Sequence, residues 1–477
     1  IFPLSDTLTH MVIFDRKVVR HPSDHVSIYF DEFLEMGRSR KSQDEVNRRT
    51  ALATPEDIAN ILYTSGTTGA SKGVVLTHKM YQAAMRENDS VLPLSENDVF
   101  LNFLPFTHVF ERGWAYLGIS EGCHLAVNLH PADVLQSLQE VHPTCMSAVP
   151  RFWEKVYEGV LERIGHLPTL QQKLFRKAMT TGRIYQIDYL SKGEKPPLSL
   201  KLKYKLFDKT VFETLRKNIG LEHGNFFPVA GAAIAKEVEA FVHICGINII
   251  CGYGLTESTA TVSCDRVGAP FSIGSVGRTL KGVTVKISDS NEILLKGDTI
   301  FKEYYRKPKE THEAIDDEGW FHTGDAGYLK NGELFLTDRI KDLYKTSNGK
   351  YIAPQQIESK LIVDRYIDQI VVIADKHKFV SALIVPSYAL LEAYAKSHDI
   401  KYGSMEDLCN NKEIHTFIME RINTLQQDLA SFEQVKRFCM LPSPFSIERN
   451  EITNTLKIKR KIVFEHYRKQ IEEMYEA

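Results

Sequence analysis

The chain has 477 residues, a formal net charge of −2, and 43% hydrophobic and 25% charged residues. This ordinary globular composition argues against disorder or a fibrous repeat, and roughly two to four domains or subdomains are expected at this length. The balanced charge disfavours attachment to nucleic acid by bulk charge. The longest segment without Asp, Glu, Lys or Arg, residues 240–256, is too short and too polar to span a bilayer.

Two further features indicate a cytoplasmic protein. The seven cysteines form no CxxC pair, and an odd count in a long chain is typical of reduced thiols. The first residues, Ile1 to Asp6, lack the charged and apolar regions of a signal peptide. We therefore expect a cytoplasmic location and leave peripheral contact with a membrane open.

Up to about residue 340, short β-branched runs alternate with segments of helical periodicity, which predicts a layered α/β body. Residues 191–217 are rich in Lys and Arg. This run predicts a solvated helix face, with a docking surface for anionic lipid as the alternative. The predicted strands of this region are residues 11–14, 61–63, 74–76 and 247–251, and its clearest helices are residues 134–141 and 238–245.

From about residue 276 the pattern changes to short strands with tight turns, and after Asp338 it changes again to mixed strands and helices. We place a domain boundary within residues 337–341, which gives a large domain, residues 1–337, and a small C-terminal domain, residues 338–477. The predicted strands are residues 283–287, 292–295, 332–336, 370–373 and 382–385, and the predicted helices are residues 356–364, 390–396 and 412–430.

Residues 63–73 form the most informative segment, with three glycines and five Ser or Thr residues. Glycines let successive backbone N–H groups approach an anion, hydroxyls add donors, and Lys72 supplies a positive charge, so the segment predicts a phosphate-binding loop. It is not a Walker A loop, because Ser71 stands where the second glycine is needed. The candidate phosphate contacts are Thr64, Ser65, Gly66, Thr67, Thr68, Gly69 and Lys72.

This loop resembles the phosphate-binding signature of the adenylate-forming superfamily, which includes acyl-CoA synthetases, peptide-synthetase adenylation domains and firefly luciferases. The resemblance implies that superfamily's acetyl-CoA synthetase-like α/β fold, with a large layered domain and a smaller mobile α+β C-terminal domain. Further motifs resemble those of the superfamily and follow its order across nearly the whole chain: Gly231-Ala232-Ala233, Gly252-Tyr253-Gly254-Leu255-Thr256-Glu257, the segment Trp320 to Asp325, and Arg339.

The resemblance implies where these residues would meet a nucleotide. Gly231-Ala232-Ala233 would lie against the adenine, because small side chains let backbone and ring approach closely. Tyr253, between Gly252 and Gly254, would offer the adenine a flat stacking surface. Thr256 would donate a hydrogen bond to the α-phosphate.

The metal and ribose contacts follow from the same resemblance. Glu257 would be a hard oxygen ligand for Mg²⁺, with Thr64 as a second contact of the metal. Asp325 would accept hydrogen bonds from the ribose hydroxyls, which suits a carboxylate with two acceptor oxygens. Arg339 and Lys345 would be further nucleotide contacts.

Three positions nearer the C-terminus complete the resemblance. Lys341 resembles the residue at which the small domain pivots, and Gly349 lies where the superfamily lines its CoA site. Residues 453–460 resemble the motif whose lysine drives adenylation, and alignment on the Leu-Lys-Ile core selects Lys457 as the catalytic lysine.

Residues 101–112 resemble a segment of long-chain fatty acyl-CoA synthetases, which implies that His108 lies near the reacting carboxylate and that Phe106, Phe110 and Trp114 lie near an acyl tunnel. We therefore predict an AMP-forming long-chain fatty acid–CoA ligase that uses fatty acid, ATP and CoA, with Mg²⁺ as cofactor and no nucleic-acid partner. Two alternatives stay open. One is a fatty acyl-AMP ligase that passes the acyl group to a carrier protein, and the other is a degenerate module that binds acyl groups or nucleotides without catalysis.

Relative to this superfamily the chain begins late. Long-chain members carry a longer segment before the equivalent of residues 12–14, and that segment forms part of the large domain. We therefore expect that an N-terminal part is missing from this chain or that its large domain is abnormally small.

Overall fold

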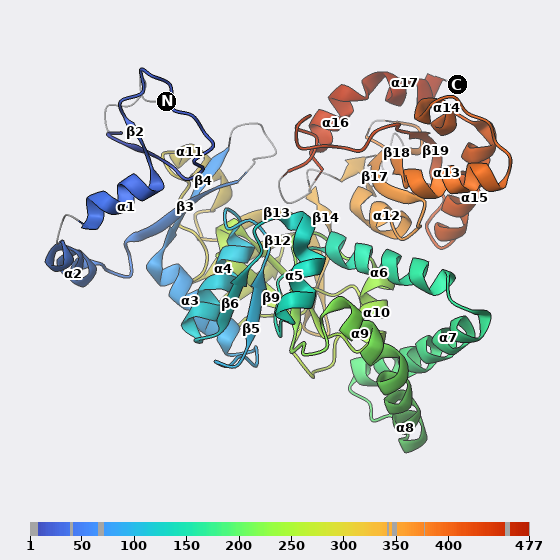
Figure 1. Ribbon diagram of the computed structural model, residues 1–477, viewed down its shortest axis with the longest axis horizontal. Helices are drawn as coiled ribbons and strands as arrows, with labels where there is room; N and C mark the ends of the chain where they lie inside the picture. Colours follow the sequence, from blue (N-terminus) through green and yellow to red (C-terminus); the bar gives the residue numbers. More distant parts are fainter. Residues whose placement is uncertain are drawn as a thin grey trace. The chain divides into compact units, whose positions relative to one another are not determined.

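The computed structural model describes residues 8–38, 42–64, 71–340, 343–345, 351–375, 377–453 and 458–476 (Figure 1). The chain divides into two compact units, residues 1–57 and residues 58–477. Within the described ranges, no helix combines the length and the apolar character needed to cross a lipid bilayer.

The first unit is small. Its two strands, β1 (Met11–Ile13) and β2 (Ser27–Tyr29), pair in parallel. The guanidinium groups of Arg16 and Arg20 lie 4.3 and 4.5 Å from the centre of the Tyr29 ring, a cation–π arrangement that holds the preceding loop against β2. Two helices complete the unit: α1 (Phe30–Arg38) and α2 (Gln43–Leu52).

The second unit is built on an eight-stranded sheet in the order β11-β12-β13-β14-β10-β9-β8-β7. β7 and β8 are parallel, and the other neighbouring pairs are antiparallel. The strands are β7 (Phe227–Val229), β8 (Ile249–Leu255), β9 (Ala260–Cys264), β10 (Arg278–Thr279), β11 (Val283–Ile287), β12 (Glu292–Gly297), β13 (Phe321–Lys330) and β14 (Glu333–Arg339).

This sheet curls strongly. Three strands separate β8 from β13 in the sheet order, yet Tyr253 on β8 donates a hydrogen bond of 2.7 Å to Asp325 on β13. Neighbouring strands lie about 4.8 Å apart, so a flat sheet would keep these two side chains far beyond hydrogen-bond distance. An apolar cluster that includes the fully buried Val262, Ile293 and Leu334, from β9, β12 and β14, packs within the curl.

Parallel strands continue on the β7 side of the sheet. β5 and β6 pair in parallel, and residues 145–148 bridge β5 to β7 through parallel pairs at Cys145 and Ala148. Parallel neighbours need crossover connections, and α4 (Val109–Ser120), α5 (Val134–Val141) and α10 (Lys236–Ile244) supply them here. The two added strands are β5 (Val99–Asn102) and β6 (His124–Val127).

The helices of this part pack through apolar faces at helical spacing. Val238, Phe241 and Val242 of α10 are buried, and they share a core with Trp153 of α6, which is fully buried. α7 and α8 project away from the sheet (Figure 1). The helices are α3 (His78–Asp89), α4 (Val109–Ser120), α5 (Val134–Val141), α6 (Pro150–Gly165), α7 (Thr169–Arg183), α8 (Leu198–Phe207), α9 (Glu213–Ile219), α10 (Lys236–Ile244) and α11 (Pro308–Ala314).

The C-terminal part has its own apolar core around the three-stranded sheet β17-β18-β19. β17 and β18 are antiparallel, and β18 and β19 are parallel. The strands are β15 (Tyr344–Lys345), β16 (Tyr351–Ile352), β17 (Ile367–Ile373), β18 (Val380–Pro386) and β19 (Val435–Met440), and the helices are α12 (Pro354–Leu361), α13 (Tyr388–Ser397), α14 (Met405–Cys409), α15 (Lys412–Leu425), α16 (Arg460–His466) and α17 (Arg468–Glu476).

The predicted mixture of strands and helices is confirmed, and the differences have local causes. The predicted helix 134–141 coincides with α5. The predicted helix 412–430 ends early, at Leu425, because the Gln426 side chain bonds the backbone of Val435 through both of its polar atoms, at 2.8 and 3.1 Å. These bonds turn the chain into β19. The predicted strand 247–251 is shifted, since β8 starts at Ile249 and runs on to Leu255.

Gly254 is a position where the curl leaves no room for a side chain. A Cβ there would lie 1.6 Å from the Ala260 carbonyl oxygen, at a register irregularity between β8 and β9. We predict that Gly254→Ala lowers the free energy of unfolding by about 3 kcal/mol or more, because the backbone must shift. Gly159→Ala is the control: its Cβ, within α6, would meet nothing within 4 Å, so the substitution should stabilise slightly. Urea denaturation measures both, and equal effects would contradict the prediction.

Candidate functional site

A β-hairpin flanks the predicted phosphate loop. β3 (Ile58–Thr64) and β4 (Lys72–Thr77) are antiparallel, and their register places Thr64 opposite Lys72. The Thr64 hydroxyl donates to the Lys72 carbonyl over 3.4 Å. The other edge of β4 is also held, since the Tyr305 amide donates to the Gly73 carbonyl over 2.7 Å. Both ends of the predicted loop are therefore anchored on paired strands.

Tyr304 links this hairpin to Glu257. The Lys72 Nζ atom lies 4.7 Å from the centre of the Tyr304 ring, and the Tyr304 hydroxyl donates to Glu257 Oε1 over 2.9 Å. Burial raises the pKa of Glu257, against the Tyr304 hydrogen bond and the positive charges of Arg339 and Lys72, which favour its ionised form. Glu257 lies in a short 3₁₀ turn, Thr256–Ser258, directly after β8, and the Thr256 side chain is buried.

Tyr253, Asp325 and Arg339 form a second cluster. Arg339 lies opposite Asp325 in the β13–β14 register, and its Nε atom is 3.4 Å from Asp325 Oδ1. The Tyr253 hydroxyl donates to the other carboxylate oxygen. Burial and the negative charge of Asp325 raise the pKa of Tyr253 well above its ordinary value. Tyr253 is only 7% exposed, so little of its ring face is accessible to a ligand.

The carboxyl ends of the parallel strands bring further predicted residues to one edge. Val229 on β7 lies opposite Cys251 on β8. Gly231 and Tyr253, each two residues further along, therefore lie at a similar level along the strand direction. Gly231 has a φ of 93°, which favours glycine, and residues 231–233 are exposed. Crevices at the carboxyl ends of parallel strands are common ligand sites in open α/β sheets.

His108 lies at the start of α4, after β5. Its Nδ1 atom accepts a hydrogen bond of 3.2 Å from the Phe110 amide, which makes His108 the N-cap of this helix. Because Nδ1 accepts, the neutral imidazole carries its proton on Nε2. The side chain is exposed.

Glu111, which was not predicted from the sequence as a site residue, anchors the segment before His108. Its carboxylate is fully buried, accepts hydrogen bonds from the Asn102 side chain at 3.0 Å and from the Ser147 hydroxyl, and is stabilised by the backbone amides of residues 103 and 104. Burial raises the pKa of Glu111 to about 7. An acidic residue one helical turn after His108, within an otherwise apolar helix, is the sequence signal that could have identified it.

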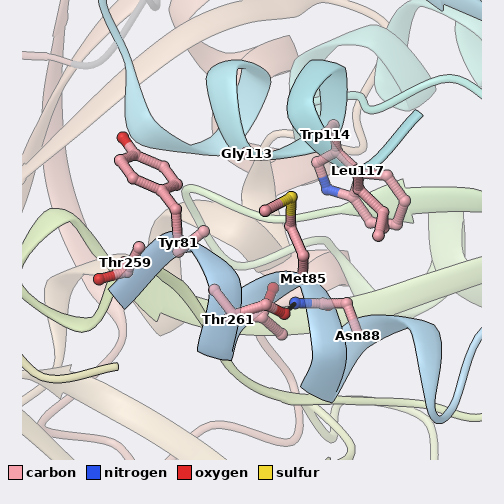
Figure 2. Close-up of a pocket in the computed structure, with 10 residues that line it drawn as sticks. Tyr81, Met85, Asn88, Gly113, Trp114, Leu117, Thr259 and Thr261 are labelled. Atoms are coloured by element: carbon pink, nitrogen blue, oxygen red, sulfur yellow. Dashed lines mark hydrogen bonds between the residues drawn. The ribbon is translucent and has the colours of Figure 1, made fainter. Parts of the chain in front are cut away.

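A small pocket lies between α3, α4 and the start of β9 (Figure 2). Trp114 and Leu117 of α4 face Met85 and Asn88 of α3 across it (Figure 2). The Asn88 amide group donates to the Ala84 carbonyl over 2.7 Å. Trp114 lines this pocket, whereas Phe106 is exposed; Phe110 is buried in the same apolar cluster as Trp114.

Several predicted site residues lie outside the described residues, and the structure gives no account of their contacts. For Lys345 the backbone is described, on β15, without its side chain. The others are Ser65, Gly66, Thr67, Thr68 and Gly69 of the predicted loop, the predicted hinge Lys341, the predicted CoA contact Gly349 and the predicted catalytic Lys457.

One further cluster joins α6 to β17. Asp368 Oδ1 lies 2.5 Å from an Arg151 guanidinium nitrogen and 2.6 Å from Lys155 Nζ. Burial opposes ionisation of Asp368, but the charges of Arg151 and Lys155 outweigh it and lower its pKa. The carboxylate thus connects the part before the predicted domain boundary to the part after it.

Two family models match the chain. The model described as AMP-binding enzyme matches residues 3–305, and the model described as AMP-binding enzyme C-terminal domain matches residues 341–477. These matches lie on either side of the predicted domain boundary.

The chain is also similar to long-chain acyl-CoA synthetases. It is 30% identical to long chain acyl-CoA synthetase 7, peroxisomal, from Arabidopsis thaliana, over 88% of this chain and 61% of that protein. It is 30% identical to long chain acyl-CoA synthetase 3 of the same plant, over 94% of this chain and 69% of that protein. It is 29% identical to long-chain-fatty-acid–CoA ligase 1 from Homo sapiens, over 94% and 66%. The chain therefore spans only 61% of the length of the first of these relatives.

Solved structures of adenylation domains share the fold. The adenylation domain of a carboxylate reductase from Mycobacterium chelonae has a TM-score of 0.69 and 21% identity, over 95% of this chain and 64% of that chain. The corresponding domain from Segniliparus rugosus, solved with AMP and a co-purified carboxylic acid, has a TM-score of 0.70 and 20% identity, over 94% and 66%. These likenesses confirm the predicted fold class.

The raised pKa of Glu111 predicts a pH-dependent contribution to stability. Between 4.5, its ordinary value, and about 7, the folded protein holds a proton there that the unfolded chain has released. Relative to Glu111→Gln, the unfolding free energy of the unaltered protein should fall as the pH rises from about 4.5 to about 7, by up to roughly 3 kcal/mol in all, and should level off above that. Urea denaturation at a series of pH values measures this difference. The exposed Glu140 supplies the control substitution Glu140→Gln, and a difference at position 111 that does not change with pH would overturn the assignment.

The Asp368 cluster predicts a change in protease sensitivity. In Asp368→Asn, two cations lose a shared carboxylate, and the contact between α6 and β17 should weaken by roughly 1 kcal/mol, which is about fivefold in the open population. Limited trypsin cleavage within residues 337–345 should accelerate by about that factor. The exposed Asp375 provides the matched control Asp375→Asn. Equal cleavage rates in the two variants would show that Asp368 does not hold these parts together.

Proposed function

The chain belongs to the AMP-binding enzyme family, and from this premise we propose that it is an AMP-forming ligase for long-chain fatty acids. In this proposal the acid reacts with ATP to give an acyl-adenylate and pyrophosphate, and CoA then takes the acyl group and releases AMP. The names of the relatives, which are long-chain acyl-CoA synthetases, support the choice of acid and of acceptor.

The observation that carries the proposal is the convergence of segments far apart in the sequence. Lys72, at the end of the predicted phosphate loop, reaches Glu257 through Tyr304. Arg339 is paired with Asp325 and also favours the ionised form of Glu257. A cation beside the predicted phosphate loop, a buried carboxylate and a second carboxylate suited to a diol are the groups that a nucleoside triphosphate requires.

The first reaction needs charge stabilisation more than covalent catalysis. A carboxylate is a poor electrophile, because a thiol that attacks it must expel oxide, and adenylation replaces that leaving group with AMP. In-line attack on the α-phosphorus builds negative charge on the phosphate, which cations and N–H donors stabilise. In the proposal Lys72 and the loop hold the outer phosphates, Thr256 donates to the α-phosphate, and Lys457 bridges the phosphate and the carboxylate.

His108 would orient the acid. Its Nδ1 atom accepts from the Phe110 amide, which fixes the ring at the start of α4, where it would meet the substrate carboxylate. Glu111 is a positioning residue in this scheme, because it holds the backbone between Asn102 and His108 through buried hydrogen bonds. Trp114 and Leu117, which line the small pocket on the same helix, would supply an apolar wall for the first part of an acyl chain.

The residues fit Mg²⁺ carried by the nucleotide. The described residues contain no group of three or more His, Cys, Asp or Glu side chains that could hold a metal, whereas Mg²⁺ typically binds one or two carboxylates together with substrate phosphates and water. Glu257 uses one oxygen for Tyr304, and Glu257 and Thr64 would hold the ion. The ion would supply charge neutralisation on the phosphates.

The second reaction places a thiolate where Lys457 acted, so the C-terminal part has to move. We infer Lys341 as the pivot and the region of Gly349 as the face that meets CoA, both by resemblance. A hinge needs only one or two residues that absorb a large φ/ψ change. The Asp368 contact with Arg151 and Lys155 would have to break during such a rotation.

Fatty-acid-dependent exchange of labelled pyrophosphate into ATP tests the proposal. We expect exchange with long-chain fatty acids, and we expect Lys457→Ala to slow it by roughly a hundredfold or more, because a cation on the transition state is lost. Thioester formation from a supplied acyl-adenylate should be nearly unchanged in this variant. Lys459→Ala, two residues further on, is the matched control.

Three outcomes would contradict the proposal. Exchange that needs no fatty acid would remove the predicted substrate class. Equal loss of both half-reactions in Lys457→Ala would overturn the role of this lysine. Transfer to a carrier protein with none to CoA would select the carrier-protein alternative instead.

A further inference from the structure

α8 carries an apolar stripe on its outer side. Leu198, Leu202 and Leu206 recur at intervals of four residues on this helix and are 72%, 60% and 62% exposed. The opposite face is already used, because Tyr204 and Phe207 are buried in the core of the second unit. The helix therefore has two apolar faces, and the outer one has no partner among the described residues.

Lysines bracket this stripe. At 100° per residue, Lys201 and Lys205 fall on one side of the three leucines and Lys203 falls on the other. All three side chains are exposed. Asp208, the acidic residue next to the helix, is paired with Arg216 over 2.7 Å. The positive charge along the stripe is therefore not neutralised by neighbouring carboxylates in the described residues.

We propose that α8 docks this protein onto the surface of an anionic lipid bilayer, with Leu198, Leu202 and Leu206 entering the boundary between headgroups and acyl chains. A leucine stripe flanked by lysines fits such a surface from both sides, because the leucines leave water while the ammonium groups reach lipid phosphates. A polyanion such as nucleic acid would match the lysines and leave the leucines exposed. The combination of exposed leucines and flanking lysines therefore favours a lipid surface over a nucleic acid.

This inference goes beyond the proposed ligase activity and does not depend on it. Docking would bring the enzyme to the phase in which long-chain fatty acids accumulate, but lipid binding is measured without any substrate. Failure of the vesicle experiment would leave the ligase proposal intact, and failure of pyrophosphate exchange would leave the docking surface intact.

Flotation with large unilamellar vesicles tests the proposal on the full chain. We expect binding to vesicles of phosphatidylcholine mixed with phosphatidylglycerol, much weaker binding to phosphatidylcholine alone, and loss of binding as salt rises. The double substitution of Leu202 and Leu206 by Ser, and the triple substitution of Lys201, Lys203 and Lys205 by Glu, should each weaken binding about tenfold or more. All five side chains are exposed, so both variants should retain the unfolding transition of the parent.

Two matched controls separate docking from general effects. Leu129→Ser changes a leucine outside α8 that is even more exposed, at 82%, and should leave binding unchanged. Substitution of the same three lysines by Arg keeps the charge and should also preserve binding.

Three results would overturn the proposal. The first is no binding to anionic vesicles, and the second is binding that survives loss of the leucines, as for a purely electrostatic patch. The third is a dimer, seen by sedimentation velocity, that dissociates in the leucine variant without any vesicle binding, because α8 would then join two copies of this chain.

Discussion

The hydrogen bond between Tyr253 and Asp325 requires the sheet to curl, and much of the candidate site depends on that curl. The two residues belong to strands that have three other strands between them in the sheet order, yet they meet at 2.7 Å. Because β13 pairs with β14 at this point, Arg339 is placed beside the same carboxylate. Burial makes this contact expensive to break, since either partner would be left as an unpaired polar group in an apolar surrounding.

The site combines fixed anchors with buried acids. β4 is bonded on both edges, so Lys72 is carried by a strand with little freedom. Glu257 and Glu111 are buried, and burial raises the pKa of both carboxyl groups. Burial disfavours the ionised form of a carboxyl group, and a cation bound beside it favours that form. A buried acid can therefore couple the binding of a metal or substrate to its own ionisation.

Much of this arrangement could be predicted from local sequence. Strong periodicity predicted helix α5 and strand β11, and apolar runs on either side of the glycine- and hydroxyl-rich segment predicted strands β3 and β4, though not their pairing. Motif order indicated that Tyr253, Asp325 and Arg339 belong to one site, and the structure brings these three side chains into contact.

The remainder depends on tertiary contacts that no local pattern carries. Nothing near Glu111 in the sequence indicates that its partners would be Asn102 and Ser147, because the Ser147 contact requires β5 and residues 145–148 to be neighbours. The predicted end of α15 was too late for the same reason. The Gln426 side chain accepts a hydrogen bond from the backbone of Val435, nine residues further on in β19, and the helix stops before it. The sheet order, and with it the curl, arises from non-local pairing.

The arrangement around Asp368 has an evolutionary consequence. A single carboxylate oxygen is shared by Arg151 and Lys155, so the two basic positions are partly redundant and the acidic position is not. Either cation could drift to a neutral residue while the other preserves the attachment. Among descendants of this sequence, variation should therefore accumulate at positions 151 and 155 in alternation, and far more slowly at 368.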